Sequence, residues 1–401
     1  MIELQRIEQA RQRISDIARQ TPVVPCDRAC DRCGRQVLLK LESLQYTGAF
    51  KIRGAANCIG QIVEQARKHG VVAASAGNHS QGVAAAADAF GVDAHIYMPE
   101  STPFLKVERT RYFGGTVLLH GDTFDEAYAE ACRAQEKEGR IFVHPFADER
   151  IIAGQGTIGL EICEQVPDCG SVLIPVGGGG LASGIASAVR QLRPDARIIG
   201  VQAENAPAMT RAFHSGKRKP VPCSPTIAEG IAVGEPDELT YSILSETLDD
   251  MVLVSEAAIA GAMLDLIEDD NLVAEGAGAV GLAALSDLYD DLPGPIVIVI
   301  SGGNVDITTM GSVIDRGLAV AERTVRLRVV LPDVPGALAD LAAAIGQQDA
   351  NIIEIFHNRL TGEVHIGRAD VEIVLLTRGP EHVQSVVASL NEAGYEARRV
   401  H

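Results

Sequence analysis

Short apolar segments alternate with alanine-rich segments from about residue 37 to about residue 317. Four of the apolar segments, at residues 37–41, 71–74, 172–176 and 296–300, are hydrophobic at nearly every position. A strand with this pattern is buried on both faces, as in a parallel sheet that is covered by helices. The alanine-rich segments supply helix-forming residues for that cover. The pattern therefore predicts an α/β fold with parallel sheets.

After residue 314 the pattern changes, and strands with alternating polar and apolar positions begin. The expected elements are a strand at 324–331, a helix after the turn at 332–336, strands at 351–357 and 371–377, a helix at 380–393 and a strand at 395–400. This βαββαβ order is the ferredoxin-like arrangement. We expect a larger domain at 1–317, a linker at 318–323 and a smaller domain at 324–401. A small lobe at about 50–147 is expected within the larger domain.

The charge of the chain limits its partners. Its 401 residues include 35 Lys and Arg and 53 Asp and Glu, so the formal net charge is −18, and no basic cluster occurs. Nucleic acids and anionic membranes attract basic surfaces, so we expect neither as a partner. An amphipathic, charged helix is expected at the start of the chain instead of a signal peptide, and no apolar run approaches the ~20 residues that span a bilayer. We expect a cytoplasmic protein.

Four consecutive glycines, Gly177 to Gly180, stand between the strand predicted at 172–176 and a helical segment. Glycines let backbone N–H groups converge, and the start of a helix adds unpaired donors and the positive end of its dipole. The segment therefore predicts a phosphate-binding loop.

The loop by itself leaves the identity of the phosphate open. Gly177, Gly179 and Ala182 match the G-x-G-x-x-A pattern of dinucleotide-binding proteins, and Glu204 follows the next predicted strand. Residues 47–56 offer a different chemistry, because Lys51 stands beside Phe50 at the start of a predicted helix. Partial burial and the positive helix end lower the pKa of such an amine, which can then attack a carbonyl carbon. Alternatively, Lys51 is an ordinary surface lysine.

Two more polar segments follow predicted strands. Residues 75–82 form a glycine-containing turn before a helix, and Ser301 follows the strand at 296–300. Ligands collect at the carboxyl ends of strands in open α/β sheets. Polar strand ends together with a reactive lysine describe a pyridoxal phosphate site better than a dinucleotide site.

Together these segments resemble the fold type II pyridoxal phosphate enzymes, in particular the threonine and serine dehydratases. The resemblance covers residues 21–317 and includes motifs at 153–157, 226–230 and 275–278. It implies a two-lobed catalytic domain in which Lys51 binds the cofactor covalently.

The same resemblance assigns the other site residues. It implies that Phe50 packs beside the cofactor ring, Asn78 bonds the phenolic oxygen and Ser301 bonds the pyridine nitrogen. The phosphate is expected at Gly177, Gly178, Gly179, Gly180 and Leu181, with Gly230 and Glu275 near the cofactor. The substrate carboxylate is expected at Ser75, Ala76, Gly77, Asn78 and His79.

The chain also departs from the family. Ala49 stands where the family usually has serine, which removes one hydroxyl near Lys51. Relatives that racemise serine carry a serine at the position of Ala76, which supplies a proton to the face opposite the lysine. We therefore expect elimination instead of racemisation. Some relatives bind a divalent cation beside the acid that corresponds to Glu204. A hard cation needs about six oxygen ligands. Here Ala208 and Thr210 stand where more oxygen ligands would be needed. We expect no required metal.

Three of the eight cysteines, Cys26, Cys30 and Cys33, have the C-x3-C-x2-C spacing of radical iron–sulfur enzymes. Those motifs generally carry an aromatic residue where this chain has Arg32. The same spacing lies on one face of a helix, and we favour that interpretation, with reduced cysteines throughout.

The first turn of the smaller domain and residues 351–354 resemble ACT domains, which sense small molecules and commonly pair through their sheets. The resemblance implies an amino-acid effector near Asp333, Gly336 and Asn351, and a homodimer or homotetramer. Alternatively, the domain mediates dimerisation and binds nothing.

The resemblance implies a threonine dehydratase (threonine ammonia-lyase) that converts L-threonine to 2-oxobutanoate and ammonia, also L-serine to pyruvate, with isoleucine as the effector to test. The main alternative is a threo-3-hydroxyaspartate or serine dehydratase. The second carboxylate of hydroxyaspartate needs a cation, for which Arg53, Arg133 and His79 are candidates. An NAD-dependent oxidoreductase and a nonenzymatic amino-acid sensor are further alternatives, and the sensor would have no use for Lys51.

Overall fold

The computed structural model describes residues 1–358 and 367–400. The chain forms two compact units, the first from Met1 to Asp306 and the second from Ile307 onward. The expected boundary at residue 317 lies inside the helix α14 (Ile307–Val320), which also includes the first residues of the expected linker at 318–323. The domain limits at 317 and 324 remain a prediction.

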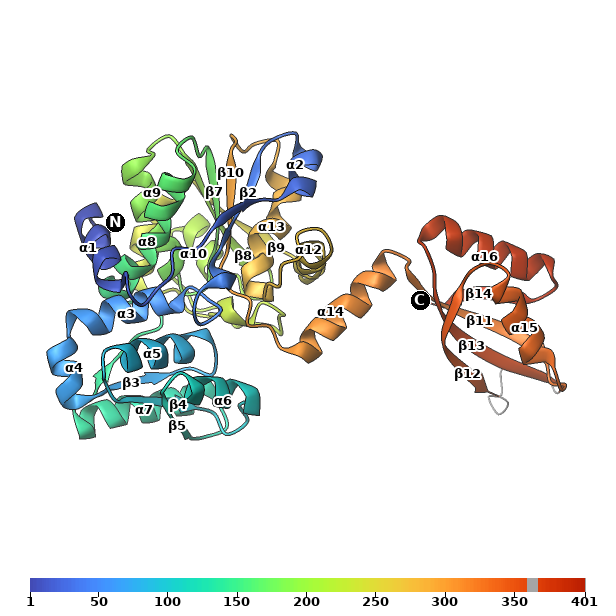
Figure 1. The fold of residues 1–401 in the computed structure, drawn as a ribbon, viewed down its shortest axis with the longest axis horizontal. Coiled ribbons are helices and arrows are strands. Elements are labelled where there is room, and N and C mark those ends of the chain that lie inside the picture. Colours follow the sequence, from blue (N-terminus) through green and yellow to red (C-terminus); the bar gives the residue numbers. More distant parts are fainter. Residues whose placement is uncertain (359–366, 401) are drawn as a thin grey trace. The chain divides into compact units, whose positions relative to one another are not determined.

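The first unit contains a six-stranded sheet with the order β1-β2-β10-β7-β8-β9 (Figure 1). Its strands are β1 (Val23–Pro25), β2 (Val37–Leu41), β7 (Ser171–Pro175), β8 (Arg197–Ala203), β9 (Asp250–Val254) and β10 (Ile296–Ile300). Only β1 is antiparallel to its neighbour; the other strands of this sheet are parallel. Every residue of β2, β7 and β10 is buried, which confirms the prediction of a parallel sheet covered on both faces.

Helices cover the two faces of this sheet. On one face, Ile158 of α8 (Glu149–Gln165) and Ile185 of α9 (Gly180–Leu192) share a core cluster with Val297. On the other face, Gly281 of α13 (Gly276–Leu288) lies so close that an added Cβ would be 2.7 Å from Ile298. Val297 and Ile298 are neighbours in β10 and therefore point to opposite faces. The remaining elements of this part are α1 (Leu4–Ile14), α2 (Asp27–Cys33), η1 (Glu42–Leu44), α10 (Ala208–Ser215), η2 (Glu229–Ile231), α11 (Glu238–Thr247) and α12 (Glu256–Glu268).

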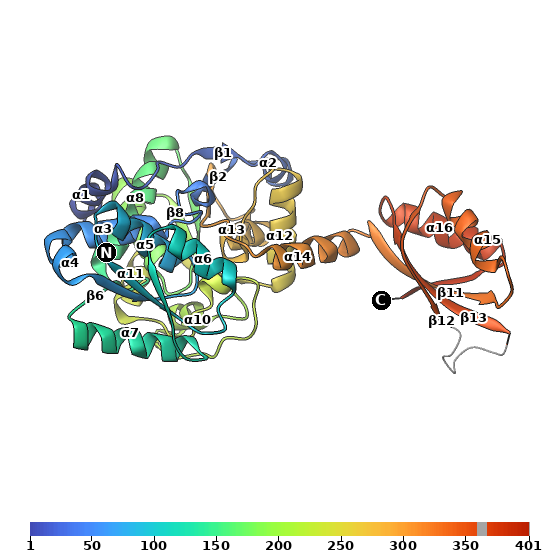
Figure 2. The ribbon, with the colours of Figure 1, turned by 60° about the horizontal axis from the view of Figure 1, so that its bottom comes forward.

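The small lobe contains a second parallel sheet with the order β5-β4-β3-β6. Its strands are β3 (Val71–Ala74), β4 (Ala94–Met98), β5 (Thr116–Leu119) and β6 (Ile141–Phe142). Figure 1 shows β3, β4 and β5 grouped with α5, α6 and α7, apart from the larger sheet, and Figure 2 shows the same lobe turned forward. The helices of the lobe are α3 (Lys51–Gln61), α4 (Val63–His69), α5 (Asn78–Ala89), α6 (Phe104–Tyr112) and α7 (Phe124–Glu138).

The second unit has the predicted βαββαβ order. Its elements after α14 are β11 (Thr324–Pro332), α15 (Ala337–Gly346), β12 (Asn351–Asn358), β13 (Arg368–Leu376), α16 (Pro380–Glu392) and β14 (Glu396–Val400). The strands form an antiparallel sheet with the order β12-β13-β11-β14. Leu327 and Ile373 of the sheet share a core cluster with Leu341 of α15 and Val386 of α16, so both helices pack on the sheet.

Candidate active site

The loop that carries Lys51 is bound to the segment after β10. Phe50 N donates a hydrogen bond to Ser301 O at 3.1 Å, and Gly303 N donates to Gly48 O at 2.9 Å. These main-chain bonds hold the start of α3 at the carboxyl ends of β2 and β10, where open α/β sheets place their ligands.

The amine of Lys51 is partly buried and is polarised by its neighbours. Its Nζ donates to Pro145 O at 2.9 Å and lies 5.2 Å from the centroid of the Phe50 ring. Burial lowers the pKa of the amine to about 8, and the negative charge of Glu275 opposes part of this decrease. A large fraction of the amine is therefore uncharged near pH 8, as a nucleophile or general base requires.

Asn78 and Glu275 meet across the two lobes. Asn78 begins α5 in the small lobe, and Glu275 precedes α13 in the larger part. Asn78 Nδ2 donates to both carboxylate oxygens of Glu275, at 2.7 and 3.0 Å. Burial raises the pKa of the Glu275 carboxyl, which the Asn78 hydrogen bonds partly oppose. Gly230 lies alongside, because a Cβ added there would be 3.6 Å from Glu275 Oε1.

The glycine loop has no room for side chains. A Cβ on Gly178 would lie 2.5 Å from the ring of Phe146, and one on Gly180 would lie 2.9 Å from Phe146 Cα. Gly179 has φ +89°, which other residues rarely adopt. The loop leads directly into α9, so its backbone and the helix start form a cradle that fits a phosphate group. The side chain of Leu181 is buried in the core cluster, which leaves only its backbone for such a role.

Ser301 ends the buried strand β10 with an uncharged hydroxyl. Its side chain is only 2% exposed, and its Oγ donates to Ala277 O at 3.5 Å, which is a long and weak contact. The hydroxyl therefore has capacity for a stronger partner. This donor set, with the lowered pKa of Lys51 and the glycine cradle, fits pyridoxal phosphate: an amine for its aldehyde carbon, backbone for its phosphate and a hydroxyl for its ring nitrogen.

The turn from Ser75 to Gly77 connects β3 with α5, so its backbone N–H groups lie at a helix start. Gly77 N donates to Ser75 Oγ at 3.1 Å. The ring of His79 is engaged elsewhere, since its Nε2 lies 2.8 Å from Val143 O, and burial lowers its pKa to about 3. The ring is therefore neutral at physiological pH. Contacts from this turn to a substrate carboxylate remain a prediction, with backbone donors and Asn78 better suited to them than the His79 ring.

The segment from His144 to Phe146 also borders the site, although no pattern in the sequence predicts it. Pro145 accepts the Lys51 hydrogen bond, Phe146 packs on the glycine loop, and His144 Nδ1 accepts from Phe146 N at 3.2 Å. The segment follows β6, which has only two residues and gives little hydrophobic pattern. Its position after a strand was the available signal.

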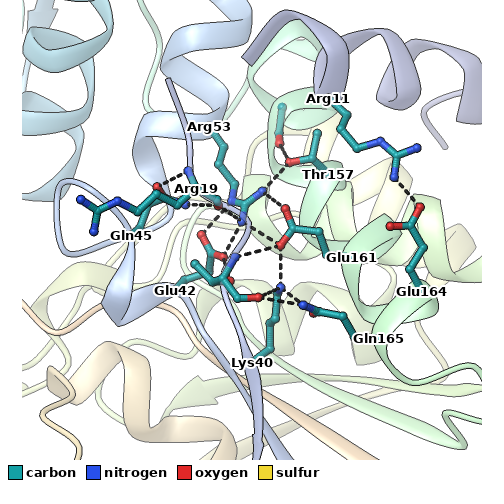
Figure 3. Close-up of polar contacts among 12 residues, drawn as sticks. Arg11, Arg19, Lys40, Glu42, Gln45, Arg53, Thr157, Glu161, Glu164 and Gln165 are labelled. Atoms are coloured by element: carbon teal, nitrogen blue, oxygen red, sulfur yellow. Dashed lines mark hydrogen bonds and ion pairs between the residues drawn. The ribbon is translucent and has the colours of Figure 1, made fainter. Parts of the chain in front are cut away.

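The two arginines considered for a second substrate carboxylate are already paired. Arg53 is 1% exposed and bonds Glu42 and Glu161 in a network that also contains Lys40 (Figure 3). Arg133 forms an ion pair with Glu130 within α7 at 3.0 Å. With His79 neutral, none of the three candidates offers a free positive charge.

The cysteine motif lies at a helix, as the sequence predicts. Cys30 and Cys33 lie on α2, and Cys26 is its N-cap residue. Cys26 Sγ donates to Asp270 Oδ2 at 3.4 Å, and burial raises its pKa to about 12. Across residues 1–358 and 367–400, no group of three or more His, Cys, Asp and Glu side chains is arranged to hold a metal ion, and no helix there is long and apolar enough to cross a membrane.

Comparisons with known proteins agree with this geometry. A model of the family described as "Pyridoxal-phosphate dependent enzyme" matches residues 14–302. The chain is 46% identical over 400 residues to an L-threonine ammonia-lyase of Thermotoga maritima, with 100% of both chains covered. It is 46% identical over 396 residues to one of Geobacter sulfurreducens, with 98% of both covered.

The chain also resembles solved structures of related enzymes. Threonine deaminase isoform 2 of Solanum lycopersicum matches with a TM-score of 0.74 and 37% identity, over 78% of this chain and 88% of that one. Maize serine racemase matches with a TM-score of 0.74 and 33% identity, over 80% of this chain and 99% of that one.

Proposed function

Because the chain belongs to the family of pyridoxal-phosphate dependent enzymes, we propose that it is an L-threonine ammonia-lyase, which converts L-threonine to 2-oxobutanoate and ammonia. The observation that carries the proposal is the partly buried Lys51 amine at the carboxyl ends of the sheet, with Glu275 and the glycine cradle around it. Full-length relatives with 46% identity support the choice of threonine. An oxidoreductase built on the glycine loop has no such support.

When bound, the cofactor withdraws electrons from the α-carbon of the amino acid and so makes its proton acidic. Lys51 would hold the cofactor through its amine, and the same amine, when free, is placed to take the α-proton of the substrate. The lowered pKa of Lys51 makes it a base at moderately alkaline pH. Glu275 stabilises the proton on the amine once it has been transferred.

Two neutral residues favour elimination over racemisation. Ser301 presents a hydroxyl and no carboxylate, so it would not hold a proton on the ring nitrogen of the cofactor. Ala76 has no proton to return to the α-carbon from the side opposite Lys51. Loss of the β-hydroxyl is then the favoured outcome.

The partners of the three candidate cations also favour threonine or serine over 3-hydroxyaspartate. Arg53 is bound to two carboxylates, Arg133 to Glu130, and His79 is uncharged. A second substrate carboxylate would have to lose its water without gaining any of these cations as a partner. L-serine remains a second substrate, since one methyl group changes discrimination by only about 1–3 kcal/mol.

The test is keto-acid release by the purified protein with added pyridoxal phosphate. L-threonine, L-serine and L-threo-3-hydroxyaspartate are supplied in parallel. We expect 2-oxobutanoate to dominate, pyruvate to form more slowly, and Lys51→Ala to form neither. Oxaloacetate as the main product, or full activity of Lys51→Ala, would overturn the proposal.

For the second unit we propose an ACT-like regulatory role, with isoleucine as the first amino acid to test. The βαββαβ order supports it, as do Gly336, which has φ +94° at the N-cap of α15, and Asn351, which starts β12. Asp333 lies in the same turn as Gly336. Activity of the full chain with and without isoleucine, in the wild type and in Asp333→Ala, tests the role. An unchanged response in the variant would argue against a site at this turn.

Two further features belong to the proposal. The resemblance to ACT domains, which pair through their sheets, supports a homodimer or homotetramer, and sedimentation of the purified chain measures it. A substrate that is a free amino acid of general metabolism is consistent with a cytoplasmic location, which cell fractionation would test.

A further inference from the structure

Asn304 joins the loop before Lys51 to the side chain of Asn78. Asn304 Nδ2 donates to Thr47 O at 2.8 Å and to Asn78 Oδ1 at 2.9 Å. On its other side, Asn304 Oδ1 accepts from Arg109 Nη1 at 3.3 Å. All polar atoms of the Asn304 amide therefore have partners.

These partners fix which way the Asn304 amide faces. A guanidinium only donates hydrogen bonds, and a main-chain carbonyl only accepts them. Arg109 therefore requires the oxygen of Asn304 on its side, and Thr47 O requires the nitrogen on the opposite side. Because an amide orientation is assigned from its hydrogen bonds, two independent partners here give the same answer.

The fixed amide of Asn304 in turn orients Asn78. Since Asn304 presents a donor, Asn78 must turn its Oδ1 toward it, and the Nδ2 of Asn78 then faces Glu275 at 2.7 and 3.0 Å. The carboxylate of Glu275 favours the same orientation, since it accepts from Asn78 Nδ2. If Asn304 presented an acceptor, Asn78 Oδ1 would face it without a donor, and the Asn78 amide would lose the partner that holds its oxygen.

Asn304 is held rigidly relative to the Lys51 loop. A Cβ on Gly48 would lie 2.4 Å from Asn304 Oδ1, so the amide lies directly against the backbone of that loop. Gly303 N also donates to Gly48 O at 2.9 Å. Asn304 therefore sets Asn78, from the small lobe, at a fixed position relative to the loop that carries Lys51.

We propose that Asn304 is a positioning residue for the cofactor: it keeps the Nδ2 of Asn78 pointed into the site. Arg109 in turn holds the amide of Asn304 in its orientation. The inference rests on the proposed function only in taking pyridoxal phosphate as the ligand, with its phenolic oxygen as the acceptor for Asn78. Arg109 lies on α6 and is exposed, so its effect passes through Asn304.

The test is a double-mutant cycle in cofactor affinity. The apoenzyme of the full chain is titrated with pyridoxal phosphate, and the dissociation constant and the absorption band of the bound cofactor are measured without substrate. We expect Asn304→Ala to weaken binding about tenfold, which corresponds to about 1.4 kcal/mol, and to shift the band. In an Asn78→Ala background the same change should cost less than about twofold, because the group it positions is gone.

Asn304→Asp sharpens the test, because it keeps the shape and replaces the donor with an acceptor. We expect it to weaken binding more than Asn304→Ala does, and by a larger factor when Asn78 is present than in the Asn78→Ala background. Equal losses in both backgrounds would overturn the positioning role, since they would reveal a general structural effect. Unchanged affinity and an unchanged band in Asn304→Ala would also overturn it.

Arg109→Met changes an exposed side chain, so it should leave folding unaffected. We expect a loss of about two- to fivefold in cofactor affinity that disappears in the Asn304→Ala background. The matched control is Arg111→Met, on the same helix, whose guanidinium pairs with Glu108 at 2.9 Å and should leave affinity unchanged. Because no substrate is present, these results are independent of whether threonine is the substrate.

Discussion

Arg53 bonds both carboxylate oxygens of Glu161, at 2.6 and 3.0 Å, only two residues along the chain from Lys51. Both side chains are buried, and Glu161 also accepts from Lys40 Nζ at 2.5 Å. The pair joins α3 to α8. It therefore holds the helix that begins with Lys51 against one of the helices that cover the larger sheet. A charge-paired network of this kind depends on all its members, because each one left alone is a buried charge.

Replacing Glu161 by alanine should therefore destabilise the protein strongly. The change leaves Arg53 and Lys40 sharing the single carboxylate of Glu42, and we expect the free energy of unfolding to fall by about 3–5 kcal/mol. Chemical denaturation measures this value. The matched control is Glu164→Ala on the same helix, which removes an exposed partner of Arg11 and should cost no more than about 1 kcal/mol. Similar losses in the two variants would show that the buried network contributes no more stability than an exposed ion pair.

The lowered pKa of Lys51 predicts how the apoenzyme takes up its cofactor. Only the uncharged amine attacks an aldehyde carbon, so the rate of covalent cofactor binding should increase with pH and level off above about 8. The rise should follow the loss of one proton. Stopped-flow absorbance measures the rate, and Lys51→Ala is the control that forms no covalent link. A midpoint near the ordinary lysine value of 10.5 would contradict the burial of the amine.

His79 should make the protein sensitive to acid. Its pKa is lowered to about 3 in the folded chain from an ordinary value of 6.5, mainly by burial. Between these values the unfolded chain binds a proton that the folded chain does not, so stability falls as the pH decreases from about 6.5 toward 3. The slope from this residue is at most about 1.4 kcal/mol per pH unit. The free energy of unfolding is measured for the wild type and for His79→Gln across this pH range. Its decrease toward low pH should be smaller in the variant. Parallel pH profiles would show that His79 is not the cause.

Gly178→Ala should weaken cofactor binding without preventing folding. The new methyl group would lie 2.5 Å from the Phe146 ring, so the ring or the phosphate loop must move. We expect at least about a tenfold increase in the dissociation constant of pyridoxal phosphate. Gly261→Ala on α12 is the matched control, because nothing lies within 4 Å of its added Cβ and affinity should stay the same. Unaltered affinity in Gly178→Ala would argue against a phosphate at this loop.

The most buried strands of the first unit and the strands of the second followed from their local patterns. A strand buried on both faces must be apolar almost throughout, so β7 and β10 could be recognised without their neighbours. The glycine loop and the start of α3 at Lys51 are equally local, because each depends on what the backbone can do over a few residues. The sequence also pointed to the shared edge of the sheet, since parallel strands end together.

Tertiary structure decided how the polar side chains are used. Arg53 was a candidate for binding a substrate, yet the fold surrounds it with Glu42 and Glu161. The turn predicted at 75–82 ends at Gly77, so His79 lies in the first turn of α5, and its ring bonds the carbonyl of Val143, 64 residues away.

The sequence by itself determined the buried strands β2, β3, β7 and β10, the glycine loop and the place of Lys51 at a helix start, because secondary structure and backbone clearance depend on nearby residues. Only the folded chain decided that Asn304 meets Asn78, 226 residues apart in the sequence, and that Pro145 meets Lys51. Hydrogen bonds act over about 3 Å, so their partners are set by the packing of the lobes and cannot be obtained from spacing along the chain.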